Sequence, residues 1–177
     1  MLRAMALGMV VLLWANGRAV AQHQHEASPY AGLESREIKA LSAEQVAQYL
    51  SGEGMGFALA AELNHYPGPR HTLDLATALE LSTEQLAEVT RIRDAMQADA
   101  RRLGEWIVGR ERALDQAFGG GGIDEATLRA RVDEVARLQA ELRYVHLRAH
   151  IAVRRVLTPV QVRRYDELRG YQPASPH

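Results

Sequence analysis

Hydrophobic residues between positions 81 and 156 recur every three or four residues, which is the spacing of an amphipathic helix. They form two sets, separated by the glycine run at residues 119–122. Two long helices joined by so short a loop run antiparallel, so the pattern predicts a long helical hairpin. The first set is Leu86, Val89, Ile92, Met96, Leu103, Ile107, Leu114 and Phe118, and the second is Leu128, Val132, Val135, Leu138, Leu142, Val145, Ala149, Val153 and Val156.

Two glycines, Gly104 and Gly109, lie inside the first long helix pattern. A glycine in a helix interior costs about 1 kcal/mol relative to alanine, so its presence needs a physical reason. We expect either a bend or the close approach of a neighbouring segment at these positions.

Shorter helical segments flank the predicted hairpin, and glycines at 52–56 and the break Pro67-Gly68-Pro69 separate them. No segment alternates polar and apolar residues as a strand does. The predicted fold class is therefore all-α, a long antiparallel helical hairpin with short flanking helices. The short helices are expected after Ser42, at about 57–64, at about 70–79, and from Thr158 to about Gly170.

A leucine, then a serine or threonine, then a glutamine three residues further on occurs three times in the chain. In such a capping box the hydroxyl accepts a hydrogen bond from a first-turn amide, and the glutamine reaches back to the amide of the capping residue. Each box therefore predicts a helix start, and Asp124 supplies a simpler cap for the second long helix. The paired residues are Ser42 with Gln45, Ser82 with Gln85, and Thr158 with Gln161.

The beginning of the chain predicts export. Residues 1–21 combine a positive start, an apolar run and small residues, as a secretory signal peptide does, with cleavage near Ala21. The apolar run is shorter than the roughly 20 residues of a membrane-spanning helix. We therefore expect a periplasmic protein with a flexible N-terminal arm at 22–40, a helical domain at 41–170 and a disordered tail at 171–177.

Composition and motifs argue against several classes of function. The formal net charge is -1 with 24% charged residues, and this balance argues against a nucleic-acid partner. The chain contains no cysteine, so no disulfide framework is available to it. It carries no nucleophile elbow, zinc-protease motif or phosphate-binding loop, so we expect no enzymatic activity and no organic cofactor.

Three histidines and a methionine are the main candidate metal ligands in the helical part, starting with His146 and His150, which are four residues apart and so share one helix face. Equal rise along the two arms of the hairpin places Met96 opposite His146. If the helix at 70–79 folds back on the hairpin, His71 falls level with His150. We therefore predict a zinc, copper or nickel site at His71, His146 and His150, with Met96 or Glu62 as a further ligand.

Each of these histidines also has a simpler explanation. A pair four residues apart arises by chance and can be solvated, and His71 can cap or pack at a helix start. His23 and His25, beside Glu26, form a small chelating cluster in the arm that would bind copper or zinc weakly. A processed, disordered start explains that cluster as well.

The boxes at residues 81–85 and 157–161, which flank a long helical hairpin behind a signal peptide, resemble the LTxxQ motifs of the Spy/CpxP family. The resemblance covers about residues 81–170, and Ser82 replaces the usual threonine, which caps a helix equally well. This superfamily includes periplasmic zinc-resistance-associated proteins and CnrX-type metal sensors. The histidine-bearing segments, among them 146–150, are similar to a branch described as heavy-metal sensors.

The resemblance implies a periplasmic, often dimeric helical cradle that reports metal and envelope stress or chaperones unfolded envelope proteins. Its partners would be unfolded envelope proteins or a membrane sensor protein. A homodimer is also expected because a two-helix hairpin cannot cover its own apolar face. The near-neutral charge departs from the markedly basic cradle of Spy. We therefore expect a metal-binding stress protein, with a metal-independent chaperone as the alternative.

Overall fold

The computed structural model describes residues 28–171. The predicted signal peptide at 1–21 and the histidines His23 and His25 lie outside the described residues, as does the predicted tail beyond residue 171. The chain divides into two units, Met1–Ala31 and Gly32–His177, and every helix described belongs to the second.

The described residues are helical and contain no strand, which confirms the all-α class for residues 28–171. The two helices that carry the apolar stripes are by far the longest, as the sequence predicts. The helices are the 3-10 helix η1 (Leu33–Ser35), α1 (Ala43–Ser51), α2 (Leu59–Glu62), α3 (Pro69–Asp74), α4 (Thr83–Gly119), α5 (Glu125–Val156) and α6 (Pro159–Arg169).

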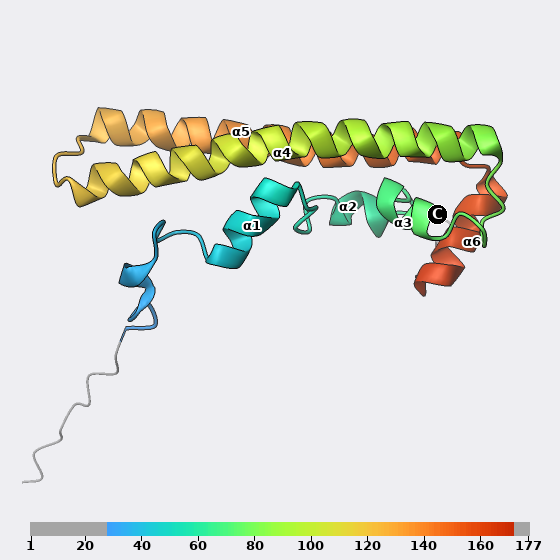
Figure 1. Cartoon of the computed structure of the whole chain (residues 1–177), viewed down its shortest axis with the longest axis horizontal. Coiled ribbons are helices and arrows are strands. Elements are labelled where there is room, and N and C mark those ends of the chain that lie inside the picture. Colours follow the sequence, from blue (N-terminus) through green and yellow to red (C-terminus); the bar gives the residue numbers. More distant parts are fainter. Residues whose placement is uncertain (1–27, 172–177) are drawn as a thin grey trace, which may run out of the picture. The chain divides into compact units, whose positions relative to one another are not determined.

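Helices α4 and α5 lie side by side, and α1, α2 and α3 follow one another along this pair (Figure 1). The apolar stripes of α4 and α5 meet in two clusters of buried side chains, and Met96 packs against both clusters. One cluster also takes in residues of α1, and the other takes in Leu157 and Val162 at the start of α6. The stripes therefore bury one face of each long helix.

Two ion pairs join α4 to α5 at different distances from the loop between the two helices. Near the loop between the two helices, Arg110 Nε donates to Glu134 Oε1 at 2.6 Å. Further from the loop, Arg148 pairs with Asp99. The exposed ion pairs contribute little stability themselves, but they tie the stretch of α4 that carries Met96 to the stretch of α5 that carries His146 and His150.

Each helix that follows a capping box starts with both halves of the box formed. Ser82 Oγ accepts from the Gln85 amide at 3.2 Å, and Gln85 Oε1 accepts from the Ser82 amide at 3.1 Å. Thr158 and Gln161 repeat this arrangement at α6. These reciprocal bonds satisfy amides that a helix start would otherwise leave unpaired.

The side chains of Gln85 and Gln161 also meet each other, which the local pattern does not reveal. Each amide nitrogen donates to the other glutamine's oxygen, at 2.9 and 3.0 Å. Gln85 further donates to the Val156 carbonyl, and Gln161 to the Leu79 carbonyl. The two boxes thus join the starts of α4 and α6 to the end of α5.

The two glycines of α4 have different surroundings. A Cβ at Gly104 would lie 2.0 Å from the Tyr49 carbonyl oxygen, so only glycine lets α1 approach α4 this closely. A Cβ at Gly109 would meet no atom within 4 Å. The close approach expected from the sequence is therefore present at Gly104 and absent at Gly109.

The two short helices before α4 are shorter than their sequence pattern predicts. The segment expected at 57–64 is helical only as α2, and that expected at 70–79 only as α3, with turns up to residue 80. The backbone takes positive φ at His65 (65°), in the turn after α2, and at Glu80 (51°), in the turns between α3 and α4. Turns therefore make up much of the chain between α2 and α4.

Within the predicted arm at 22–40, Ile38 and Lys39 contact the long helices, although most of residues 32–40 are exposed. Ile38 is 2% exposed and belongs to the same buried cluster as residues of α4 and α5. Lys39 donates to Asp115 from both its backbone amide and its Nζ. The isolated apolar Ile38 carries no periodic signal, so the sequence pattern misses this contact.

Candidate functional site

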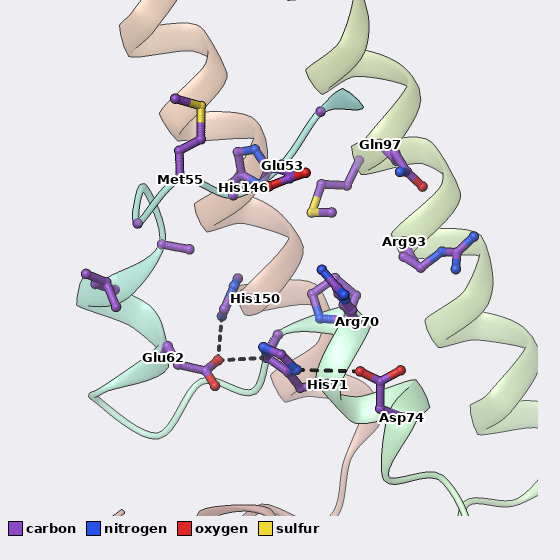
Figure 2. A pocket seen from close by; sticks show the side chains of 18 of the residues that line it. Glu53, Met55, Glu62, Arg70, His71, Asp74, Arg93, Gln97, His146 and His150 are labelled. Atoms are coloured by element: carbon purple, nitrogen blue, oxygen red, sulfur yellow. Dashed lines mark hydrogen bonds and ion pairs between the residues drawn. The ribbon is translucent and has the colours of Figure 1, made fainter. Parts of the chain in front are cut away.

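A pocket of about 470 Å³ lies where the segment from α1 to α3 meets α4 and α5 (Figure 2). The long helices form one wall, and α2, α3 and the loops around them form another. The five metal-site residues predicted from the helical part all line it, namely Glu62, His71, Met96, His146 and His150. The pocket therefore gathers side chains from segments far apart in the sequence.

His146 is the most enclosed of the pocket histidines. It lies on α5, is 3% exposed, and stacks on Phe57 with the ring centroids 6.2 Å apart. Its Nε2 is buried and has no hydrogen-bond partner among residues 28–171. Burial, and secondarily the nearby His150, lower the pKa of His146 to about 4. The imidazole is therefore neutral at pH 7 and retains a lone pair.

His150 lies one turn further along α5 and is held in one orientation. Its Nδ1 is 2.7 Å from the Tyr66 carbonyl oxygen, which can only accept, so Nδ1 carries the proton. In the neutral ring the lone pair is then on Nε2. A histidine that donates through Nδ1 to a backbone carbonyl is the usual arrangement behind a metal-binding Nε2.

Gly68 brings the backbone close to this ring. A Cβ at position 68 would lie 2.9 Å from Cε1 and 3.1 Å from Nε2 of His150. The φ of Gly68 is -80°, so sterics beside the ring, and not backbone conformation, favour glycine here. The glycine of the break Pro67-Gly68-Pro69 thus lets the loop pack close to the His150 ring.

Glu62 ends α2 and organises the base of the pocket. Its carboxylate is 8% exposed and accepts from Tyr165 Oη at 2.6 Å, Tyr171 Oη at 2.9 Å and the Gly68 amide at 3.2 Å. Arg169 Nε lies 3.5 Å away. Burial, and then the bond to Glu62, raise the pKa of Tyr165, so this phenol remains a donor. Glu62 therefore acts as a hydrogen-bond acceptor that positions its neighbours.

A further contact ties α6 to the same region. His65 Nδ1 is 2.8 Å from Asp166 Oδ2, between the loop after α2 and the middle of α6. Together with the bonds from Tyr165 and Tyr171 to Glu62, it fastens α6 against the loop that carries Tyr66. The orientation of His150 therefore depends on how this loop is held.

His71 is at the pocket but is not grouped with the other two histidines. Its Nδ1 is 3.6 Å from Asp74 Oδ2, one turn on along α3, and its side chain is 39% exposed. In the part of the chain described here, no three histidine, aspartate or glutamate side chains are placed to hold one ion together. The predicted triad of His71, His146 and His150 thus shares a pocket without forming a ready ligand set.

The sequence patterns miss one residue that lines the pocket and two that contact its histidines. Met55 lines the pocket from the loop after α1, where its own φ is 42°. Phe57 stacks on His146, and Tyr66 contributes only its carbonyl. The glycines at 52–56 signal that the chain bends, but nothing in the local sequence indicates which helix face the bend approaches.

A scan against protein-family models, a search of curated proteins and a search of solved structures each found no match. Within residues 28–171 there is also no helix with the length and apolar character needed to span a membrane. The geometry of the pocket is therefore the main guide to function.

Proposed function

We propose that this chain is a non-enzymatic, exported protein of the Spy/CpxP type that binds a transition metal ion at His146 and His150. The observation that carries the proposal is the buried Nε2 of His146, which lacks a hydrogen-bond partner among the described residues and lies beside a second imidazole. The likeness of its capping boxes to the LTxxQ motifs supports a role in heavy-metal sensing or resistance in the periplasm.

A metal ion at His146 would remove an energetic penalty. Leaving a buried polar atom without a partner costs about 1–3 kcal/mol, and coordination of Nε2 would offset that cost. The lowered pKa of His146 also means that a proton competes weakly for its lone pair at neutral pH. Both features favour metal binding.

His150 completes a chelating pair on the same face of α5. The Tyr66 carbonyl holds its Nδ1 proton, which leaves the Nε2 lone pair for an ion. Gly68 keeps the space beside Nε2 free of a side chain. His71 is peripheral in this proposal, because its side chain is exposed and faces Asp74.

Titration calorimetry with Zn(II), Ni(II) and Cu(II) tests the proposal. The protein would begin at Gln22 and carry His23→Ala and His25→Ala, so that the predicted arm cluster adds no binding. We expect one ion per chain, with affinity at least roughly tenfold lower in His146→Gln and in His150→Gln.

The matched control is His71→Gln, which should bind nearly as the parent does. The proposal is wrong if none of the ions binds, or if the two α5 variants bind as tightly as the parent. Equal losses of affinity in all three variants would mean that His71 is also a ligand, as the sequence predicts.

A metal-independent chaperone is the second candidate. Trp106 and Phe118 on α4 and Tyr144 on α5 are large apolar or aromatic side chains that are 50%, 56% and 59% exposed. Exposed side chains of this kind can bind the apolar segments of unfolded proteins. A homodimer would cover part of the same surface.

An aggregation assay with an unfolding client separates the two candidates. A chaperone suppresses aggregation without added metal, and Trp106→Ser combined with Phe118→Ser abolishes the effect. A protein that only binds metal leaves the client's aggregation unchanged, both as the parent and as the double variant.

A further inference from the structure

We infer that the ion is monovalent copper, bound by the imidazoles of His146 and His150 and the thioether of Met96. The inference rests on the proposed metal-binding function and names the ion and the third donor. It draws on three features of the pocket, which are the types of donor side chain, their placement on facing helices, and the surroundings of the buried imidazole.

The donor side chains of the pocket are softer than a zinc site requires. Zinc and nickel sites draw on several imidazole, carboxylate or thiolate groups, and no three histidine, aspartate or glutamate side chains are grouped for this within residues 28–171. Besides its carboxylates and histidines, the pocket is lined by two methionines, Met55 and Met96. Thioethers are soft ligands that select Cu(I) over harder divalent ions.

Met96 is placed better than Met55 to act with the histidine pair. It lines the pocket from α4, the helix that packs along α5 with its histidine pair, and it contacts both buried clusters. In Figure 2, Met55 belongs to a loop and lies on the opposite side of His146 from His150. Two rigid helices therefore supply all three proposed donors.

The surroundings of His146 also suit a monovalent ion that accepts few ligands. Phe57 stacks on the ring, so one side of the site is apolar. The nearest buried carboxylate, Glu62, is already engaged by two tyrosines and the Gly68 amide. A divalent ion would bring more charge into this enclosure than its free donors neutralise, whereas Cu(I) brings less.

Competition with a chromogenic Cu(I) chelator, under anaerobic reducing conditions, measures the affinity directly. The protein would again carry His23→Ala and His25→Ala. We expect Met96→Leu, which keeps the apolar volume, to weaken Cu(I) binding at least roughly tenfold while leaving Zn(II) binding unchanged. Met55→Leu is the matched control and should bind Cu(I) as the parent does.

The outcomes separate this inference from the proposed function. Binding of zinc or nickel without binding of Cu(I), or an unchanged Cu(I) affinity in Met96→Leu, overturns the inference alone. A loss in Met55→Leu with none in Met96→Leu also overturns it. If no ion binds, the inference and the proposed function both fail.

X-ray absorption at the copper edge gives a measurement that needs no variant. In the copper-loaded parent we expect one sulfur neighbour beside nitrogen neighbours. A shell of nitrogen and oxygen alone would overturn the assignment of Met96.

Discussion

The buried imidazole of His146 makes the metal-free protein sensitive to acid. Burial lowers its pKa from 6.5 to about 4, so between these values the unfolded chain binds a proton that the folded chain does not. The free energy of unfolding should therefore fall as the pH drops from about 6.5 to about 4. The loss should level off below that range, at roughly 3 kcal/mol by linkage.

Urea denaturation of the metal-free protein at several pH values between 7 and 4 measures this loss. His146→Gln is the control, because it removes the titrating group and should flatten the pH dependence in this range. Parallel losses in the parent and the variant would assign the acid sensitivity to other residues.

At the level of helices, alanine substitutions at Gly104 and Gly109 should change the stability in opposite directions. Gly104→Ala places a Cβ against the Tyr49 carbonyl, so α1 must move away from α4, with a loss of roughly 1–3 kcal/mol. Gly109→Ala meets nothing within 4 Å and should raise the stability by about 0.5–1 kcal/mol through helix propensity. Thermal unfolding of both variants checks the signs, and a stabilising Gly104→Ala would contradict the close approach of α1.

The contact between Gln85 and Gln161 predicts that two capping boxes are coupled. Gln45 bonds back to its own cap at Ser42, so Gln45→Ala should cost about 1 kcal/mol, as the loss of a cap does. Gln85→Ala should cost more, because it also removes the bonds between the Gln85 and Gln161 side chains and the side-chain donor to the Val156 carbonyl.

A double-mutant cycle with Gln85→Ala and Gln161→Ala isolates the contact between the two side chains. We expect a coupling energy of roughly 1 kcal/mol, since both amides lose a partner in either single variant. Purely additive losses would mean that each box acts only on its own helix.

The helices that the sequence predicts well are those specified by neighbouring residues. A cap and an apolar stripe are local features, which is why Ser82, Asp124 and Thr158 mark the starts of α4, α5 and α6. The contact of Gln85 with Gln161 joins residues 76 positions apart, and no local pattern specifies it.

For the whole molecule, the sequence predicts which chemical groups the pocket contains better than how they are arranged. Helical rise predicts that Met96 and His146 are level, because both lie on long regular helices. The placement of His71 depends on how α3 packs against α4 and α5, and that of Gly68 on the turn at His65. These placements depend on residues far apart in the sequence, so neither follows from spacing.

The pocket is also connected to the end of the described chain. His150 Nδ1 lies 3.7 Å from Glu62 Oε2, and Glu62 accepts from Tyr165 on α6 and from Tyr171 just after it. An ion that shifts the His150 ring therefore changes the surroundings of Glu62. Through Glu62 such a shift would reach α6.

The nitrogen atoms of the histidine rings can be observed one by one. In ¹⁵N-labelled protein, long-range ¹H–¹⁵N NMR spectra before and after addition of Zn(II) or Cu(I), both diamagnetic, report the state of each ring. We predict that the Nε2 signals of His146 and His150 move together to metal-bound positions and saturate at one ion per chain, while His150 Nδ1 stays protonated against Tyr66. Unmoved Nε2 signals at His146 and His150, with or without changes at His65 and His71, would contradict the account.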